Sequence, residues 1–205
     1  MLEARDLGFR HAGASRPLFE GLSLSVSPGE RLALRAPSGF GKTTLCRLLA
    51  GYERPRAGQV LIDGVPLPER GVCRVQLINQ HPERVLDPRL RMASSLAEAG
   101  EPEGRVLDGL GIQEKWLTRH PHELSGGEMQ RFCIARALTA NPAYLIADEI
   151  TTMLDAVTQA RIWGFLLAEA ERRNLGLVFV SHSPALTRRL ATRSLDLTDA
   201  VRGTR

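Results

Sequence analysis

A serine, two glycines and a glutamate stand together at residues 124–131, at the start of a segment with helical apolar spacing. Ser125 has the chemistry of a helix N-cap, and Gly126 and Gly127 lack a Cβ, so backbone N–H groups there can approach an anion closely. The apolar residues that follow predict a helix over about 128–138. A helix N-terminus carries exposed donors and the positive end of the helix dipole. The run therefore predicts an anion-binding surface.

A second candidate anion site lies upstream, where residues 31–36 read as a short strand and residues 45–50 as a helix. Between them runs a glycine-bearing loop that ends in Lys42 and Thr43. Strand, loop, Lys-Thr and helix in this order form a P-loop. In a P-loop, backbone N–H groups cradle nucleotide phosphates, the Lys42 ammonium reaches the β and γ oxygens, and the Thr43 hydroxyl can ligate Mg²⁺. The predicted nucleotide-binding residues here are Pro37, Ser38, Gly39, Phe40, Gly41, Lys42, Thr43 and Thr44.

Two carboxylates follow an apolar run further along the chain. Residues 143–147 read as a buried parallel strand, and Asp148 and Glu149 stand at its C-terminal end, where ligands bind in α/β sheets. Asp148 would hold Mg²⁺ through its water shell, and Glu149 would polarise an attacking water as general base. A strand that ends in two solvated acids is the competing interpretation.

Two further strand ends carry polar tips. Residues 71–80 read as a strand that terminates at Gln80, whose amide can contact Mg²⁺ or the attacking water. Gln76 is the competing candidate, but it lies in the middle of the same predicted strand. Residues 176–182 form another apolar run, and His182 stands at its end. A histidine in such a place is also compatible with an ordinary surface residue.

Taken in order, these runs resemble the ATP-binding cassette (ABC) family over nearly the whole chain. Residues 124–131 match the signature motif LSGGxxQR, which in that family closes on the γ-phosphate held by a partner cassette. Gln80 matches the Q-loop glutamine, His182 the histidine that contacts the γ-phosphate, and Asp155 the aspartate of the D-loop. The spacing of Asp148 after the signature, as in ABC cassettes, argues against a strand that merely ends in solvated acids.

The resemblance implies ATP and Mg²⁺ as ligands, and ATP hydrolysis by a head-to-tail dimer of cassettes. A water held by Glu149 would attack in line. Each composite site would combine one subunit's Lys42, Thr43, Gln80, Asp148, Glu149 and His182 with Ser125 and Gly127 of the other. Gly126 and Asp155 complete the predicted nucleotide-binding set.

Five positions depart from the family's usual pattern. Ala36 replaces the first glycine of the P-loop motif, and a positive φ there would cost an alanine about 1 kcal/mol. Bulky Phe40 stands where a small residue is usual. Ile150, Met153 and Ser183 replace, in turn, a proline, an alanine and an aspartate. Apart from Met153, these substitutions motivate a competing hypothesis, in which the chain binds nucleotide within a heterodimer but hydrolyses it weakly.

The resemblance also implies the fold class, which is α/β with a P-loop NTPase (RecA-like) core, a small antiparallel β-subdomain and an inserted helical subdomain. We expect a single ABC domain over residues 1–205. Residues 1–82 and 135–205 would form the core and the β-subdomain, and residues from about 83–134 the helical subdomain with the signature. Alternating apolar residues within 1–30 support antiparallel strands in the first part.

Two expectations concern the surroundings of individual side chains. His11 stands about where the family places a tyrosine that stacks on adenine. An imidazole can stack in the same way, and a histidine in an N-terminal loop can equally be solvated, so both interpretations stay open. Further along, Leu154, Val157 and Ile162 share one side of an amphipathic helix over 154–173, which predicts that they pack into the core.

Length and composition set the outer bounds. A chain of 205 residues with 43% hydrophobic and 24% charged residues supports one soluble domain with a substantial core. Its net charge of +4 permits contact with acidic lipid or nucleic acid but demands neither, and we expect no nucleic-acid partner. The 3 cysteines have no paired spacing and indicate reduced thiols. No apolar run is long enough to span a bilayer and no signal-peptide pattern occurs, so any membrane spans would come from another polypeptide.

These features predict an ATP-hydrolysing subunit that lies peripherally at the cytoplasmic face of the inner membrane and couples hydrolysis to solute transport. Its partners would be transmembrane permease subunits, a second ABC cassette and an extracytoplasmic solute-binding protein. Residues 83–92 and 121–124 are similar to segments of importers of peptides, opines and nickel, which makes import of such ligands the first hypothesis. A soluble ABC ATPase that acts in repair, translation or cofactor assembly is the alternative.

Overall fold

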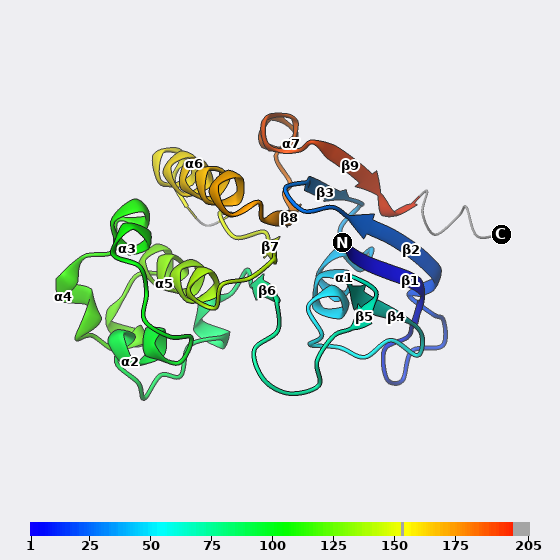
Figure 1. The fold of residues 1–205 in the computed structure, drawn as a ribbon, viewed down its shortest axis with the longest axis horizontal. Coiled ribbons are helices and arrows are strands. Elements are labelled where there is room, and N and C mark those ends of the chain that lie inside the picture. Colours follow the sequence, from blue (N-terminus) through cyan, green and yellow to red (C-terminus); the bar gives the residue numbers. More distant parts are fainter. Residues whose placement is uncertain (153, 199–205) are drawn as a thin grey trace.

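The computed structural model describes residues 1–152 and 154–198, and Figure 1 shows how they are arranged. The substituted D-loop position Met153 lies outside the described residues. A central parallel sheet stands between an antiparallel sheet on one side and a group of helices on the other (Figure 1). The predicted α/β class is thereby confirmed.

The parallel sheet has the strand order β6-β7-β8-β3-β9. Its strands are β3 (Arg31–Arg35), β6 (Val75–Ile78), β7 (Tyr144–Asp148), β8 (Gly176–Val180) and β9 (Arg193–Asp196). The prediction of a strand over residues 71–80 is wrong at both ends, because β6 begins at Val75 and stops at Ile78. The carbonyl of Asn79 instead accepts a hydrogen bond from the Gln130 side chain (3.2 Å), which takes the chain out of the ladder. Gln80 therefore lies in the loop beyond the strand.

The helices are α1 (Lys42–Leu49), α2 (Met92–Ala97), α3 (Gly104–Leu110), α4 (Glu114–Leu117), α5 (Gly126–Thr139), α6 (Ala156–Arg173) and α7 (Pro184–Leu190), with 3-10 turns at Pro82–Arg84 and Pro121–Glu123. Helices α2 to α5 gather on the side away from the antiparallel sheet (Figure 1). The division into a core and a helical subdomain over 83–134 stays a prediction. Helix α5 runs without a break across the boundary proposed there.

The antiparallel sheet confirms the expectation for the first part of the chain. Its strands, in the order β2-β1-β4-β5, are β1 (Leu2–Phe9), β2 (Phe19–Val26), β4 (Ala57–Ile62) and β5 (Val65–Pro66). The pairing of β1 with β4 shifts between Arg5 and Gly8. Gly58 lies opposite this irregularity with a φ of +73°, and a Cβ on it would stand 2.2 Å from the Arg5 carbonyl oxygen. Only glycine lets the two backbones approach so closely.

The parallel strands are apolar on both faces because they separate two hydrophobic cores. Along β8, Val178 and Val180 face the core that contains α1 and the antiparallel sheet. The alternate residues Leu177 and Phe179 face the core that contains α5 and α6. Successive side chains of a strand point to opposite faces, so one strand supplies both cores. The carboxyl end of the sheet is thereby fixed between two packed layers.

Helix α6 begins two residues later than predicted, because Asp155 is its N-cap. Ile162 is buried, as predicted, whereas the prediction for Val157 is wrong, since its exposed fraction is 79%. Val157 lies in the first turn of α6, which projects beyond the core. Neither α6 nor any other helix within 1–152 and 154–198 has the length and apolar character needed to cross a membrane.

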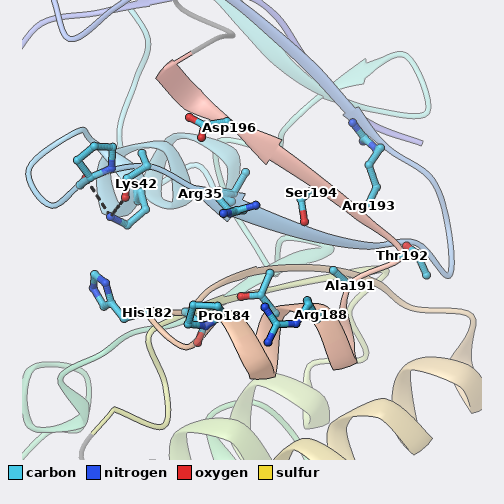
Figure 2. Close-up of a pocket in the computed structure, with 15 residues that line it drawn as sticks. Arg35, Lys42, His182, Pro184, Arg188, Ala191, Thr192, Arg193, Ser194 and Asp196 are labelled. Atoms are coloured by element: carbon cyan, nitrogen blue, oxygen red, sulfur yellow. Dashed lines mark hydrogen bonds between the residues drawn. The ribbon is translucent and has the colours of Figure 1, made fainter.

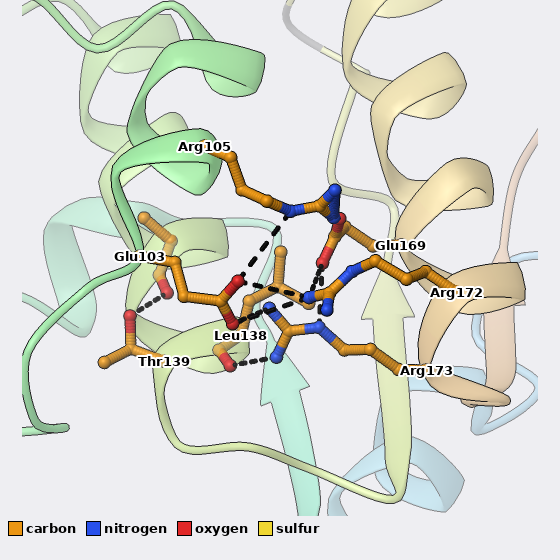
Figure 3. A network of polar contacts seen from close by, with 8 residues as sticks. Glu103, Arg105, Leu138, Thr139, Glu169, Arg172 and Arg173 are labelled. Carbon is orange, nitrogen blue, oxygen red and sulfur yellow. Dashed lines mark hydrogen bonds and ion pairs between the residues drawn. The ribbon is translucent and has the colours of Figure 1, made fainter.

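A buried ion-pair network joins α6 to the segment that leads into α3 (Figure 3). The fully buried carboxylate of Glu169 contacts the guanidinium groups of Arg105, Arg172 (3.0 Å) and Arg173 (2.7 Å). The carboxylate of Glu103 contacts Arg172 (3.2 Å) and Arg173 (2.8 Å) as well. Because a buried charge is costly unless it is paired, the Glu169 carboxylate depends on these guanidinium groups.

We expect Glu169→Ala to lower the free energy of unfolding by about 2–3 kcal/mol, because it removes the buried carboxylate that bonds Arg172 and Arg173 and leaves these groups with Glu103 as their remaining counter-charge. Urea titration followed by circular dichroism measures this loss. Glu171→Ala, an exposed change on the same helix, is the matched control and should stay close to wild type. Equal stability of the two variants would contradict the account of Glu169.

Candidate functional site

The predicted P-loop curls around its own lysine. Gly39 and Gly41 have φ angles of +78° and +89°, and α1 begins directly after Gly41. The Lys42 ammonium donates hydrogen bonds to the carbonyl oxygens of Ala36 (2.9 Å) and Pro37 (3.1 Å), which Figure 2 shows. These bonds hold the ammonium beside the first turn of α1, where backbone N–H groups have no partner inside the helix. The loop therefore offers a fixed cation and free donors together.

The two substitutions in the P-loop fit the fold. Ala36 does not adopt a positive φ, so the expected strain at that position does not arise. Phe40 is half-buried and packs with Leu18 against the core on the α1 side. Gly41 must remain glycine, because a Cβ there would lie 2.9 Å from a methyl carbon of Leu18. The bulky Phe40 side chain thus packs against the core.

Asp148, the last residue of β7, is a buried carboxylate with an exposed fraction of 3%. Burial raises its pKa, and the charge of Glu149 raises it further, while a hydrogen bond from Thr43 opposes the shift. Within the described part of the chain, the Oδ1 atom of Asp148 has no hydrogen-bond partner. A buried acceptor without a donor is suited to a ligand-borne cation or water.

The donor set around Asp148 suits a cation that brings some of its own ligands. Asp148 and the adjacent Thr43 hydroxyl supply oxygen atoms, and both line one cavity with Gln80. Among residues 1–152 and 154–198, no three His, Cys, Asp or Glu side chains are grouped as ligands of a metal ion. Mg²⁺ typically uses one or two carboxylates and keeps water and phosphate oxygens as its other ligands. These residues fit that mode of binding.

Glu149 is the point at which the predicted catalytic side chains meet. Its Oε1 lies 2.7 Å from the Nε2 of His182, and its Oε2 accepts a hydrogen bond of 3.2 Å from the Gln80 amide. The competing candidate Gln76 instead donates to the Cys73 carbonyl (2.8 Å). The structure therefore brings Gln80, and not Gln76, to the glutamate.

The backbone of Glu149 is strained. Its φ is +53°, in the left-handed region that side chains with a Cβ rarely adopt. Such a conformation costs of order 1–3 kcal/mol and persists only where surrounding contacts enforce it. Residues held in this way are concentrated at functional sites.

His182 and Lys42 lie at one end of a cleft of about 560 Å³, which extends between β3, α7 and β9 (Figure 2). Ser183, in place of the usual aspartate, is the N-cap of α7 and accepts a hydrogen bond from the Leu186 N–H (3.2 Å). The cap fixes the start of α7 directly after His182. The substitution at position 183 is therefore compatible with the observed direction of His182 toward Glu149.

The signature residues open helix α5. The helix begins at Gly126, two residues earlier than predicted, so Gly126 and Gly127 belong to its first turn. Ser125 is the N-cap, as predicted: its hydroxyl accepts from the Glu128 N–H (3.3 Å), and its own N–H donates to the Glu128 carboxylate (2.8 Å). The role of Glu128 was not predicted, although Ser-x-x-Glu is the sequence sign of a capping box.

The two glycines of the signature have different surroundings. A Cβ on Gly127 would stand 2.8 Å from a methyl carbon of Leu154, whereas a Cβ on Gly126 would meet no atom within 4 Å. Gly127 is thus required for packing against the residue that precedes Asp155. Gly126 leaves an open approach to the N–H groups of the helix tip.

Within one chain, the signature tip and the P-loop belong to different layers. Helices α1 and α5 lie on opposite sides of β6 and β7 (Figure 1). Leu45 of α1 packs in one core, and Phe132 of α5 packs in the other. This separation is compatible with the predicted pairing of each motif with the other motif of a second chain.

His11 and Asp155 have local partners. The Nε2 of His11 lies 3.4 Å from the hydroxyl of Thr44 in α1, and its ring makes an edge contact with Phe9 at 5.0 Å between centroids. His11 is exposed beside the P-loop helix. Asp155 caps α6 by accepting hydrogen bonds from the N–H groups of Thr158 (2.9 Å) and Val157 (3.0 Å), and these bonds lower its pKa.

The fold and this arrangement of loop, carboxylates and helix tip define a class, the P-loop ATPases built as ATP-binding cassettes. A family model described as ABC transporter matches residues 19–152. The chain belongs to the ABC transporter family.

Individual relatives agree with this assignment. The chain is 36% identical to the nickel import ATP-binding protein NikE of Brucella abortus over 204 residues, which are 90% of this chain and 76% of NikE. It is 36% identical to the glutathione import ATP-binding protein GsiA of Pectobacterium atrosepticum over 85% of this chain, but spans only 31% of the length of GsiA. In fold, it matches a dimeric ATP-binding cassette, MJ0796, bound to ADP and Pi, with a TM-score of 0.83 and 24% identity over 96% of this chain and 94% of that one.

We expect Asp148→Asn to raise the melting temperature of the nucleotide-free protein at pH 7. A carboxyl whose pKa is raised in the folded state destabilises that state once it ionises. The loss of folding stability grows as pH rises from the ordinary pKa of about 3.9 through the raised pKa. The difference in melting temperature between Asp148→Asn and wild type should therefore become smaller as pH is lowered. Differential scanning calorimetry across pH measures the effect.

Asp87→Asn is the matched control, since Arg89 lowers the pKa of Asp87 and its ionised form is favoured in the folded state. That variant should gain no stability at pH 7. A lower melting temperature for Asp148→Asn would contradict the assignment of Asp148 as a buried, poorly compensated charge.

Proposed function

We propose that this chain is the ATP-binding and ATP-hydrolysing subunit of an ABC transporter. The observation that carries the proposal is the convergence of Gln80 and His182 on Glu149, beside the Lys42 loop and the buried Asp148. Polar side chains from three strand ends and a P-loop thus surround one point. Such an arrangement serves phosphoryl transfer to water.

ATP would bind with its phosphates in the loop of residues 37–44. The first-turn N–H groups of α1 and the Lys42 ammonium would contact the β- and γ-phosphates. Mg²⁺ would be held by Thr43 and Asp148, with Gln80 close by, and it would neutralise charge on the phosphate oxygens. His11, beside Thr44, would lie within reach of the adenine ring.

Glu149 would orient and deprotonate the attacking water. Its two oxygens contact His182 and Gln80. Both partners can turn to the γ-phosphate and the water when ATP binds, which would free the carboxylate to accept a proton. His182 would then donate a hydrogen bond to the γ-phosphate.

A second cassette would complete each site with Ser125, Gly126 and Gly127 at the tip of α5. The tip has the first-turn N–H groups of Gly126 and Gly127 and the positive end of the helix dipole, and α5 lies on the other side of β6 and β7 from α1 (Figure 1). Closure of the two cassettes on ATP and their release after hydrolysis would be the two-state element that drives the membrane partner.

The remaining partners follow from the importer relatives. Transmembrane permease subunits would bind the chain at the cytoplasmic face of the inner membrane, and an extracytoplasmic solute-binding protein would deliver the ligand. Peptides, opines or nickel-type ligands are the proposed cargo, in line with the similarity of residues 83–92 and 121–124 and with NikE. No nucleic-acid partner is proposed.

The competing hypothesis, a cassette that binds nucleotide but hydrolyses it weakly, loses support from three of the four substitutions that prompted it. Ala36 is unstrained, Phe40 packs into the core, and Ser183 caps α7. Each substitution has a place in the fold that leaves Lys42 and His182 in position. A soluble, non-transport ABC ATPase remains the second candidate, and co-purification with a multi-span membrane protein distinguishes it from a transporter subunit.

Glu149→Gln should lower the steady-state ATPase rate by about 10²–10⁴-fold, because the amide cannot accept the proton of the attacking water. ATP affinity should stay within a few-fold, since the Lys42 loop is unchanged. Phosphate release and equilibrium binding of a fluorescent ATP analogue measure the two quantities. A rate unchanged by this substitution would refute the general-base role.

The composite site predicts a dimer that depends on the α5 tip. With Mg·ATP, the Glu149→Gln variant should elute as a dimer, because slow hydrolysis traps the closed state. Adding Gly126→Asp should keep it monomeric, since the new carboxylate would face the γ-phosphate across the interface without a clash in its own chain. Size-exclusion chromatography with light scattering measures the mass.

Gly104→Asp is the matched control for the dimer experiment. Gly104 is likewise the first residue of a helix, α3, and a Cβ on it would also meet no atom within 4 Å. The Glu149→Gln/Gly104→Asp variant should dimerise normally. Dimers of the Gly126→Asp double variant would exclude the α5 tip from the interface.

A further inference from the structure

The chain segment that follows Glu149 is tied to helix α6 through one hydroxyl. Thr151 has an exposed fraction of 4%, and its Oγ1 accepts hydrogen bonds from the Gln159 amide (2.8 Å) and from the Trp163 indole N–H (3.0 Å). Both donors belong to α6. A buried oxygen with two donors has a fixed position, because moving it would leave the buried indole N–H of Trp163 and the half-buried amide of Gln159 unpaired.

The anchor on α6 is itself fixed by the sheet. Trp163 has an exposed fraction of 2%, and its ring packs edge-on against Phe179 of β8 at 5.5 Å between centroids. β8 pairs with β7, the strand that ends just before Glu149. Thr151 is thus connected, through Trp163 and Phe179, to the strands β7 and β8 that position the site.

Hydrogen bonds between neighbouring residues of the same turn hold the backbone of Glu149 in place relative to Thr151. The Glu149 carbonyl oxygen accepts hydrogen bonds from the N–H (3.2 Å) and the hydroxyl (2.7 Å) of Thr152, and the Glu149 N–H donates to the Val180 carbonyl (3.3 Å). The glutamate is held on both sides while its φ is +53°. If the following residues were free to move, the backbone would relax toward a common φ and carry the carboxylate away from Gln80 and His182.

We propose that Thr151, bonded to Gln159 and Trp163, is a positioning residue that holds the carboxylate of Glu149 between Gln80 and His182. The inference rests on the proposed function, in which Glu149 activates water. Thr151 contacts no reacting atom and acts through the turn of residues 149–152. A shift of about 1 Å in a catalytic group can cost on the order of 100-fold in rate.

The test compares Thr151→Val with Thr151→Ser. Valine keeps the shape but removes the acceptor, whereas serine keeps the acceptor. We expect valine to lower kcat about 10- to 100-fold with the KM for ATP within about 2-fold of wild type, and serine to restore most of the rate. Thr139→Val removes a hydroxyl that bonds the Ala135 carbonyl in α5, outside the Glu149 turn, and is the matched control with wild-type kcat.

A second measurement separates positioning of Glu149 from general weakening of the fold. In a Glu149→Gln background, Thr151→Val should lower the residual rate by no more than about 2-fold, because there is no longer a general base to misplace. If Thr151→Val does not fold, Trp163→Phe and Gln159→Leu each remove one donor and keep most of the packing. Each should lower kcat by a smaller factor and leave the KM for ATP unchanged.

The outcomes are distinct. A Thr151→Val rate within 2-fold of wild type, a loss that serine does not restore, or a loss of equal size in the Glu149→Gln background would overturn the positioning role. A wild-type protein without ATPase activity, or with activity unaffected by Glu149→Gln, would overturn the proposed function and this inference with it. Loss of rate confined to variants that remove the acceptor or a donor, and absent in Thr139→Val, supports the inference.

Discussion

The register of the parallel sheet is the constraint on which the site depends. Asp148 of β7 pairs with Val180 of β8, and Val180 pairs with Leu34 of β3. The three strands therefore end in one row, and the P-loop, Glu149 and His182 all follow directly from that row. A slip of one residue would turn every side chain of a strand to the opposite core. The two apolar cores that flank the sheet penalise such a slip, so packing far from the ligand sets the geometry of the chemistry.

The same edge of the sheet concentrates features that oppose stability. It carries a buried carboxylate with a raised pKa and a second carboxylate with a strained backbone. In the proposed function, Mg²⁺ bound with ATP would supply a positive charge beside the buried Asp148 carboxylate. Binding of such a ligand to the folded state would stabilise the protein through linkage. The apolar strands beneath the site supply the stability that permits this arrangement.

The sequence allowed prediction of those features that local chemistry determines. The strand, glycine loop and Lys42 follow from short-range patterns, as do the paired acids at 148 and 149 and the cap at Ser125. The features that were missed depend on contacts between distant residues. Val157 has the right periodicity for the core but lies in a turn that projects beyond it, and β6 ends early because Asn79 bonds to Gln130 of α5. The negative φ at Ala36 and the buried position of Glu169 are likewise properties of the assembled fold, which no local pattern encodes.

The packing of the helices in two separate cores explains why such a fold would share its sites between two chains. The P-loop follows a strand of the central sheet, and the signature tip opens a helix that packs in the core on the other side of that sheet. Folding α5 back over the P-loop of its own chain would expose the apolar face that it buries with β6, α2 and α3. At about 25 cal/mol for each Å² of apolar surface, exposure of several large side chains would cost more than one helix-tip contact with phosphate could return. In the proposed function, the helix tip would therefore contact a phosphate held by another cassette. The nucleotide would then lie between two chains, each of which keeps its own core packed.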